Sequence, residues 1–319
     1  FTIGRNWPMA SQIVLASTIG KEVKRIMKLA DFELYKSLLY EKSGLVITPD
    51  KSYLLDSRLT PIAKKWGYPT LDMMTLQLRA LPDQKLVKDV IEAMTTNETS
   101  FFRDTKPFQL FQDTILPAMI QSRAAKKTVR IWCAACSSGQ EPYSLAMILK
   151  DKEAQLKGWR FEIVATDLSE DILAQAKRAV YSQFEVQRGL PIQYLMKHFT
   201  QVGETWALKD EIKSMIKFST FNLLDDMGRM GTFDIIFCRN VLIYFDEKTK
   251  GGILGRMDKQ LTPDGFLLLG GAETVLGITD KFVPMPEKRG LYIKNPALQP
   301  SSPPPASSGG FTSGLFKRT

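Results

Sequence analysis

Apolar residues recur every three or four positions from about residue 29 to residue 94, and this spacing predicts amphipathic helices. The first helix shows the spacing in Phe32, Tyr35, Leu38 and Leu39. Four short helices with brief connections are expected, and such a set is typical of a small helical domain. We place this domain at residues 25–94.

Start and stop residues divide this helical region into its elements. Gly44 follows the first helix as a stop signal. Asp50 and Thr70 are expected to cap the second and third helices, because their side-chain oxygens can accept hydrogen bonds from free backbone N–H groups. The fourth helix follows Pro82.

From residue 107 onward the pattern changes to short, compact apolar runs separated by helical spacing. The runs are VRIWCAA, FEIVATD, IKFSTFN, FDIIFCRN and GFLLLGG. This alternation predicts a doubly wound α/β domain at 107–295, with a mostly parallel sheet covered on both faces. Ligands of such sheets bind at the carboxyl ends of the strands, so the residues after each run are candidates for chemistry.

Four segments fall outside these two patterns. Residues 184–217 are too long for a simple helix-to-strand connection, so an inserted subdomain is expected there. Residues 296–319 are rich in Pro, Ser and Gly, which predicts a disordered tail. Residues 1–24 are taken as an N-terminal extension. Residues 95–106 contain TTNETSFFRD and have the composition of a linker.

Composition and charge narrow the class of protein. The chain has 319 residues, of which 44% are apolar, and this suits a globular protein of one or two domains. No run approaches the ~20 apolar residues of a membrane span, and the N-terminal apolar run is too short for a signal peptide. Three cysteines favour a reducing, cytoplasmic setting. The net charge of +9 favours an acidic partner: nucleic acid, an anionic membrane or an acidic protein surface.

The first strand end lacks the motifs of a phosphate-binding loop. Neither G-x-G-x-x-G nor G-x-x-x-x-G-K occurs there, so a dinucleotide or nucleoside triphosphate is not indicated. Gly139 permits a tight turn, and Pro142 suits the first position of the following helix. Glu141 would repel a phosphate but would pair with an ammonium group or a ribose. Its alternative role is to complement the positive end of that helix.

The second strand end carries Asp167, and an acid at this place commonly holds ribose hydroxyls. Its alternative role is to cap the helix that starts near Ser169. Together with Gly139 and Glu141, Asp167 points to an adenosine cofactor without phosphates. S-adenosylmethionine fits this description, because it offers an adenine, a ribose diol and a charged amino-acid end.

The third and fourth strand ends are also polar. Asn222, followed by Leu223, suits an adenine edge, because an amide both donates and accepts hydrogen bonds. Arg239 and Asn240 follow the most apolar run. Tyr244 would lie near Asn240 if this segment turns helically. On the residue alone, a core position for Tyr244 is the favoured alternative.

Four blocks in this order resemble the chemotaxis receptor methyltransferases, the CheR family, over roughly residues 25–295: TTNETSFFRD, CAACSSGQEPYSLAM, ATDLSEDILAQA and FDIIFCRNVLIYF. The resemblance implies a class I methyltransferase fold with a helical N-terminal domain and an inserted β-subdomain. It also implies a protein-glutamate O-methyltransferase that transfers a methyl group from S-adenosylmethionine to glutamates of the receptors' cytoplasmic domains. The products are glutamyl methyl esters and S-adenosylhomocysteine. A cytoplasmic monomer is expected, with no direct membrane insertion and no nucleic-acid partner.

The resemblance also implies roles for individual residues. Arg103 and Tyr244 match residues that act near the methyl transfer, and Arg103 also matches a cofactor contact. The other matched cofactor contacts are Asn97, Thr99, Glu141, Asp167, Asn222, Leu223, Arg239 and Asn240. No metal is implied.

The implied chemistry suits the residues that are present. A glutamate acceptor has an unperturbed pKa of ~4.3, so it is ionised at neutral pH and needs no general base. The single histidine, His198, falls in the insertion and is expected at the surface. Cys133 and Cys136 form one C-x-x-C without a second pair, so they are expected to pack a strand end rather than bind zinc.

Two alternatives to receptor methylation are weighed against these motifs. A nucleic-acid methyltransferase acting on an amino group usually has a [D/N]-P-P-[Y/F] turn where this chain has RNVLIY, and none of the cysteines follows a proline as in a cytosine C5 enzyme. A non-catalytic module that senses S-adenosylmethionine or binds receptors is disfavoured by the intact set of matched residues.

Two features bear on how a receptor would be bound. The helical domain carries Lys51, Arg58, Lys64 and Lys65, which would attract an acidic receptor helix if they share a face, or else form an ordinary solvated surface. In some family members the β-subdomain binds a receptor's C-terminal pentapeptide through a longer, glycine-paired loop. Here FTQVGETWALK is short and has Gly203 alone, so methylation without that tether is expected.

Overall fold

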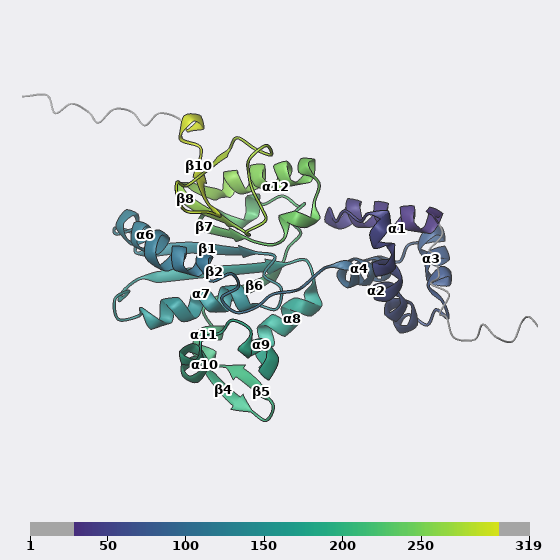
Figure 1. Ribbon diagram of the computed structural model, residues 1–319, viewed down its shortest axis with the longest axis horizontal. Helices are drawn as coiled ribbons and strands as arrows, with labels where there is room; N and C mark the ends of the chain where they lie inside the picture. Colours follow the sequence, from purple (N-terminus) through teal and green to yellow (C-terminus); the bar gives the residue numbers. More distant parts are fainter. Residues whose placement is uncertain (1–28, 300–319) are drawn as a thin grey trace, which may run out of the picture.

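A computed structural model describes residues 29–299 of the protein (Figure 1). The expected N-terminal extension and most of the expected tail lie outside these residues. The helical domain consists of α1 (Leu29–Ser43), a 3₁₀ turn (Pro49–Lys51), α2 (Ser52–Lys65), α3 (Leu71–Ala80) and α4 (Gln84–Met94). Its core is built from the apolar faces of the four helices, including Tyr35, Leu55, Met74 and Val90. It lies to one side of the α/β domain.

The start of one helix differs from the prediction and that of another agrees with it. Thr70 caps α3 as expected, since its hydroxyl accepts a hydrogen bond from the Met73 amide at 3.3 Å. The expected cap at Asp50 is wrong. Pro49 opens a separate 3₁₀ turn that includes Asp50, and α2 starts only at Ser52 without a side-chain cap.

The α/β domain contains a seven-stranded sheet in the order β6-β2-β1-β7-β8-β10-β9. The strands expected from the sequence are all present, as β1 (Thr128–Ala134), β2 (Arg160–Asp167), β6 (Ile216–Thr220), β7 (Phe233–Cys238) and β8 (Leu261–Leu269). They pair in parallel. Two unexpected short strands, β9 (Phe282–Pro284) and β10 (Leu291–Lys294), extend one edge in antiparallel fashion. The strand order reverses between β1 and β7, and such a switch point is where these sheets bind ligands.

Each face of the sheet has its own core, and β1 contributes alternate residues to both. Ile131 and Cys133 pack with α5 (Lys106–Leu110), α6 (Leu116–Ser122), α7 (Gln140–Asp151) and α8 (Glu170–Arg178). Trp132 and Ala134 pack on the opposite side with α12 (Glu247–Gln260). Both faces of the central strands are therefore buried, which explains why they read as continuous apolar runs.

The insertion forms a small separate sheet, β3-β5-β4, at the lower edge of the molecule in Figure 1. Its elements are β3 (Val180–Ser182), α9 (Gln183–Gln187), α10 (Ile192–His198), β4 (Phe199–Val202), β5 (Thr205–Leu208) and α11 (Asp210–Lys213). It starts earlier than the expected residue 184, because Ala179 adopts a left-handed conformation that ends α8 and leads directly into β3. The main sheet resumes at Ile216.

His198 is buried, so the expectation of a surface residue is wrong. Its Nε2 lies 3.2 Å from Oδ1 of Asp151 at the end of α7, and its ring stacks on Tyr194. Burial lowers the pKa of His198, although Asp151 acts in the opposite direction. The histidine thus helps to fasten the insertion to the α/β domain and lies outside the cavity described below.

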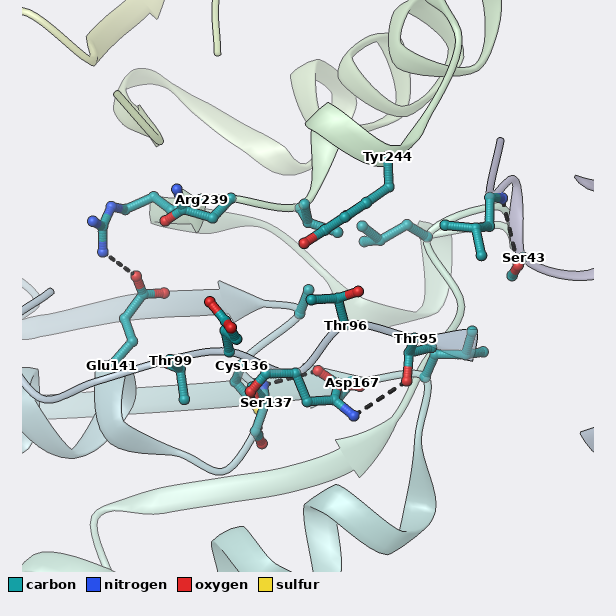
Figure 2. A pocket seen from close by; sticks show the side chains of 18 of the residues that line it. Ser43, Thr95, Thr96, Thr99, Cys136, Ser137, Glu141, Asp167, Arg239 and Tyr244 are labelled. Atoms are coloured by element: carbon teal, nitrogen blue, oxygen red, sulfur yellow. Dashed lines mark hydrogen bonds and ion pairs between the residues drawn. The ribbon is translucent and has the colours of Figure 1, made fainter. Parts of the chain in front are cut away.

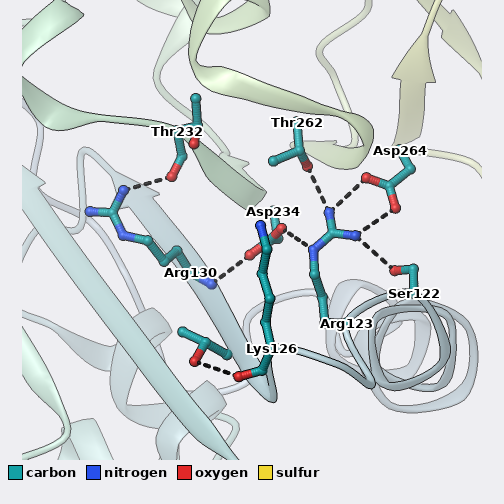
Figure 3. A network of polar contacts seen from close by, with 9 residues as sticks. Ser122, Arg123, Lys126, Arg130, Thr232, Asp234, Thr262 and Asp264 are labelled. Carbon is teal, nitrogen blue, oxygen red and sulfur yellow. Dashed lines mark hydrogen bonds and ion pairs between the residues drawn. The ribbon is translucent and has the colours of Figure 1, made fainter.

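The amino end of the sheet is held by a network around Arg123, just after α6 (Figure 3). Its Nε donates to Asp234 of β7 at 2.7 Å, and its terminal nitrogens donate to both carboxylate oxygens of Asp264 of β8 at 2.6 and 2.8 Å. Ser122 and Thr262 accept the remaining two hydrogen bonds. Asp234 also accepts from the backbone of Arg130 in β1. One guanidinium therefore links α6 with β7 and β8, and Asp234 extends the link to β1.

Within the described part of the chain, every helix is too short or too polar to span a bilayer.

Candidate cofactor site

A cavity of about 1010 Å³, including its open mouth, lies at the carboxyl ends of β1, β2, β6 and β7. The carboxyl ends of the strands are where sheets of this type bind small-molecule ligands. Every residue to which the sequence assigned a site role lines it: Asn97, Thr99, Arg103, Glu141, Asp167, Asn222, Leu223, Arg239, Asn240 and Tyr244. Their spatial grouping is a finding, and their individual roles stay predictions.

The helical domain forms part of the same cavity, which the sequence did not indicate. Ser43 and Leu45, at the end of α1, line it together with the segment from Thr95 to Thr99. Two hydrogen bonds join the domains beside it: the Val46 amide donates to the Tyr244 carbonyl at 3.0 Å, and the Asn222 side-chain amide donates to the Lys42 carbonyl at 2.7 Å. The side chain of Asn222, expected at an adenine edge, is thus partly engaged in joining the domains.

Glu141 and Arg239 form a buried ion pair inside the cavity wall (Figure 2). Glu141 lies in the first turn of α7, where Gly139 takes the left-handed conformation that brings the chain from β1 into the helix. Its Oε2 accepts from Arg239 at 2.7 Å. Burial raises the pKa of Glu141, and the arginine offsets part of that effect. Pro142 occupies the third helical position instead of the first, still within the turn whose N–H groups need no helical partner.

Arg239 follows β7 and has further partners in the joint between the domains. Its second terminal nitrogen donates to the Arg103 carbonyl at 2.9 Å and to the Asp104 carboxylate at 2.8 Å. Its Nε is buried and lacks a hydrogen-bond partner among residues 29–299. The arginine therefore ties the joint to β7 and to Glu141 without all of its donors being engaged.

Asp167 closes β2 with its carboxylate oriented by main-chain N–H groups. Oδ2 accepts from Ser137 at 2.8 Å, and Oδ1 accepts from Ser169 at 3.1 Å. Burial is the main influence on the pKa of Asp167 and raises it, while these backbone bonds act in the opposite direction. Each carboxylate oxygen has a second lone pair, so both can still accept a hydroxyl of a ligand. The cap of α8 is Ser169, since its own hydroxyl accepts from Ile172.

The joint TTNETSFFRD is tied to both domains. On one side, Arg58 of α2 donates to the Met94 and Thr95 carbonyls at 2.9 and 3.1 Å. On the other side, the Asn97 carbonyl accepts from the Ser137 hydroxyl at 2.7 Å. Phe101 and Phe102 are buried and pack in the core of the α/β domain.

The backbone of the joint is strained close to the cavity. Phe102, Asp104 and Thr105 all have positive φ, of 50°, 68° and 51°, which is uncommon for residues other than glycine. Such conformations persist only where the surrounding contacts enforce them, and they cluster at functional sites. The guanidinium of Arg103, in the middle of this stretch, donates to the Glu98 carbonyl at 2.6 Å.

The segment after β7 brings Asn240 and Tyr244 to the cavity. Asn240 has a φ of 59°, and residues Leu242–Tyr244 form a single 3₁₀ turn. In Figure 2 the Tyr244 hydroxyl points into the cavity, and the side chain is half-buried rather than part of the core.

Glu273 holds this segment and was not singled out from the sequence. It lies beyond β8, about thirty residues from its partners, and its buried carboxylate accepts backbone N–H groups of Asn240 to Ile243. No local motif signals such a contact, because nothing around residue 273 indicates which distant backbone it meets.

The cysteines do not offer a nucleophile or a metal site. Cys133, Cys136 and Cys238 are buried, and burial raises the pKa of each thiol well above its usual range. A protonated, enclosed thiol is unreactive. Among the residues that the structure describes, no group of three or more His, Cys, Asp or Glu could hold a metal ion.

A doubly wound sheet with two buried carboxylates and an arginine around a cavity at its carboxyl ends fits the class of S-adenosylmethionine-dependent methyltransferases. Comparison with known proteins identifies the family. Residues 30–95 match the all-alpha domain of CheR methyltransferases, and residues 97–291 match their SAM-binding domain. The chain belongs to the CheR methyltransferase family.

Two curated relatives illustrate the likeness. The chain is 40% identical over 257 residues to the chemotaxis protein methyltransferase Cher2 of Pseudomonas putida, and 41% identical over 258 residues to chemotaxis protein methyltransferase 1 of Pseudomonas aeruginosa. Each alignment covers 79% of this chain and 93% of the relative. The fold class, the cofactor S-adenosylmethionine and a function in methylation for chemotaxis, all expected from the sequence, are confirmed.

Proposed function

We propose that the protein methylates glutamate side chains in the cytoplasmic domains of chemoreceptors. The observation that carries this proposal is that the joint between the domains, which holds Arg103, lines the same cavity as the strand-end carboxylates Glu141 and Asp167. A cofactor bound by those carboxylates would meet an acceptor held by the joint. The products would be a glutamyl methyl ester and S-adenosylhomocysteine.

The residues present fit this cofactor. Asp167 has a lone pair free on each oxygen for a ribose diol, and its backbone bonds fix its direction. Glu141 offers a negative charge for the ammonium group, and its pairing with Arg239 keeps that charge in place despite burial. S-adenosylmethionine, when bound, supplies the electrophilic methyl group. Asn97, Thr99, Asn222, Leu223 and Asn240 would complete the wall around it.

The acceptor requires orientation rather than deprotonation. A glutamate with its usual pKa of ~4.3 is already ionised at neutral pH, so its carboxylate can attack without a general base. In our proposal Arg103 holds one carboxylate oxygen, and Tyr244 fixes the angle of the other by a hydrogen bond. Placement in a site shielded from water then supplies most of the rate enhancement.

The proposed partner is an acidic receptor helix, met in the cytoplasm by a monomer of this protein. Of the four basic residues considered, Arg58 is bound to the joint, and Lys65 pairs with Asp89 at 2.9 Å. Lys51, in the 3₁₀ turn before α2, and Lys64 of α2 are exposed and remain the candidates for attracting the receptor. The short turn between β4 and β5 supports methylation without a pentapeptide tether.

The decisive test is incubation with tritiated S-adenosylmethionine and a receptor cytoplasmic fragment, followed by alkaline release of volatile methanol. We expect base-labile label with the fragment and none with a fragment whose acceptor glutamates are replaced by alanine. Binding of the cofactor without any label would leave a non-catalytic module as the better description. Label in RNA instead would favour a nucleic-acid enzyme.

The role of Arg103 is tested by Arg103→Ala, with Lys106→Ala as a matched loss of an exposed cation three residues away. We expect turnover to fall by about 100-fold in the first variant and to stay unchanged in the second. Equal turnover in both would remove Arg103 from the proposed mechanism.

A further inference from the structure

The backbone N–H groups of residues 240–243 all point at one carboxylate. Oε1 of Glu273 accepts from Val241 at 2.9 Å, from Leu242 at 2.7 Å and from Ile243 at 3.3 Å. Oε2 accepts from Asn240 at 2.8 Å, and also from Gly270 at 2.6 Å. Glu273 is 9% exposed, and no Lys or Arg within the described ranges forms an ion pair with it.

These N–H groups would otherwise lack partners. Residues 242–244 form a single 3₁₀ turn after β7, and the first N–H groups of a helical turn have no partner inside it. Helices usually solve this with a capping side chain next in sequence. Here the cap comes from another loop, beyond β8, so the segment is held from outside rather than by its own residues.

The surrounding backbone is shaped to admit this carboxylate. A Cβ atom added to Gly270 would lie 2.7 Å from Oε2 of Glu273 and 2.9 Å from the backbone nitrogen of Asn240. Oε2 is the end of a side chain that its hydrogen bonds hold in place, and the Asn240 nitrogen belongs to the backbone, so neither can move aside without breaking these contacts. The approach of the two loops therefore depends on glycine at position 270.

The segment that Glu273 holds carries the groups closest to the proposed chemistry. Asn240 and Tyr244, one at each end, line the cavity, and Asn240 has left-handed φ. Glu273 itself lines a neighbouring hollow with Arg289 and Tyr292, not the cofactor cavity. Its hydrogen bonds therefore act on the reaction through the backbone of residues 240–243, and its negative charge also contributes to the raised pKa of Glu141.

We propose that Glu273 is a positioning residue for methyl transfer. Its carboxylate fixes the segment 240–244 so that the Tyr244 hydroxyl and the Asn240 side chain stand in register with the reacting groups. This inference rests on the proposed function and adds to it a residue that touches neither cofactor nor acceptor. Glu141 and Asp167 take no part in these five hydrogen bonds, and Asn240 is one of several residues in the cofactor wall, so turnover should fall more than cofactor affinity.

The test is Glu273→Gln, which keeps the size of the side chain. The amide retains one acceptor oxygen but presents an NH₂ group to N–H donors, so part of the cluster loses its partner. Glu287→Gln is the matched control, because it makes the same change at an exposed position of the following loop.

We expect kcat of Glu273→Gln to fall by about 10- to 100-fold, since small misplacements of reacting groups cost this much. The affinity for S-adenosylhomocysteine, measured by calorimetry, should change by no more than a few-fold, because Asn240 is one of several residues in the cofactor wall. Amide hydrogen exchange at residues 241 and 242 should accelerate by about 10- to 100-fold, which corresponds to loss of a hydrogen bond to a charged group. Glu287→Gln should change none of these.

Several outcomes would overturn the inference. Wild-type kcat in Glu273→Gln would show that the segment needs no external anchor. An equal loss of cofactor affinity would show that Glu273 shapes the cofactor cavity rather than acceptor alignment. If Glu273→Gln does not fold, Glu273→Asp is the alternative, because it keeps the charge on a shorter side chain. Wild-type kcat in Glu273→Asp, together with faster amide exchange at residues 241 and 242, would equally refute the positioning role of Glu273. Failure of the proposed function is recognised separately, by a wild-type protein that labels no receptor.

Discussion

Arg123 and Arg239 each bind two carboxylates, the first beside the amino end of β7 and the second at its carboxyl end, yet their surroundings differ. At the amino end of β7, Arg123 bonds to Asp234 and Asp264, with Ser122 and Thr262 taking its remaining donors (Figure 3). At the carboxyl end, Arg239 bonds to Glu141 and Asp104 (Figure 2). The amino-end cluster is saturated, whereas the carboxyl-end cluster lines a cavity and keeps a buried Nε without a partner among the described residues.

The difference teaches how one kind of ion pair serves two purposes. In the network around Arg123, every donor of the guanidinium has an acceptor in a fixed position, and the network holds the sheet together. A network that lines a cavity holds charges ready for a ligand, and this costs stability, because burial opposes ionisation of Glu141 and Asp167. At the carboxyl end of the sheet, the buried carboxylates therefore lower the stability of the fold but are available to bind a ligand.

The largest expected effect comes from Arg239→Ala. It leaves Glu141 buried and unpaired and releases the joint at Arg103 and Asp104. Loss of one member of a buried pair destabilises the folded state by about 3–5 kcal/mol. The unpaired Glu141 no longer keeps its charge for the ammonium group, so we expect cofactor affinity or kcat/KM to fall by about 100-fold, as for the loss of a hydrogen bond to a charged group. Titration with S-adenosylhomocysteine measures this. An affinity within a few-fold of the wild type would mean that the two clusters do not differ as described.

The next effect is on stability, from Arg123→Ala. Asp234 is 9% exposed and would lose its partner, so we expect a loss of about 3 kcal/mol in the free energy of unfolding. Denaturant titration measures this loss, and cofactor affinity well below the midpoint should stay unchanged. A variant that is equally stable but binds the cofactor poorly would reverse the assignment of the two arginines.

Cofactor affinity, which depends on the carboxyl end of the sheet, and stability, which depends on its amino end, should respond differently to pH. Burial raises the pKa of Glu141 and Asp167, so they take up protons above their usual range as pH falls, and cofactor affinity should decline first. The pKa of Asp264 is lowered, chiefly by its hydrogen bond to Arg123, so its stabilisation is present above the unfolded pKa and is lost as pH falls through the folded one.

For the site carboxylates the stability sign is opposite. Their raised pKa makes ionisation costly in the folded state, so this cost disappears at low pH and does not accelerate acid unfolding. We expect cofactor affinity to fall at a higher pH than the melting temperature does, and measuring both over the same pH series would test this order. Loss of melting temperature before loss of affinity would contradict it.

The smallest expected effect is from Thr262→Ala, which removes one hydrogen bond that Arg123 donates to a neutral hydroxyl at 3.2 Å. A loss of about 1 kcal/mol is expected by denaturant titration, because the bidentate Asp264 contact and the Asp234 contact remain. A loss as large as that of Arg123→Ala would show that the network depends on every member rather than chiefly on its charged pairs.

Prediction from sequence succeeded where the signal is local. The five core strands follow from runs of apolar residues, and Glu141, Asp167, Asn222, Arg239 and Asn240 follow from their places just after those strands. Parallel strands bring their carboxyl ends to one edge, so strand ends far apart in sequence converge in space. The same reasoning wrongly expected a cap at Asp50 and a surface position for His198. Both depend on contacts that no local pattern shows.

By itself, the sequence determined the helical domain, the parallel sheet, the class of cofactor and the strand-end residues that line the cavity, because these follow from periodicity and from position along a strand. The tertiary structure decided which donors meet which acceptors. The pairing of Arg239 with Glu141, the cluster around Arg123 and the contact of Glu273 with residues 240–243 each join segments about 30 to 140 residues apart. Only packing of the sheet and its loops brings such groups within hydrogen-bond distance, since no local pattern encodes a distant partner.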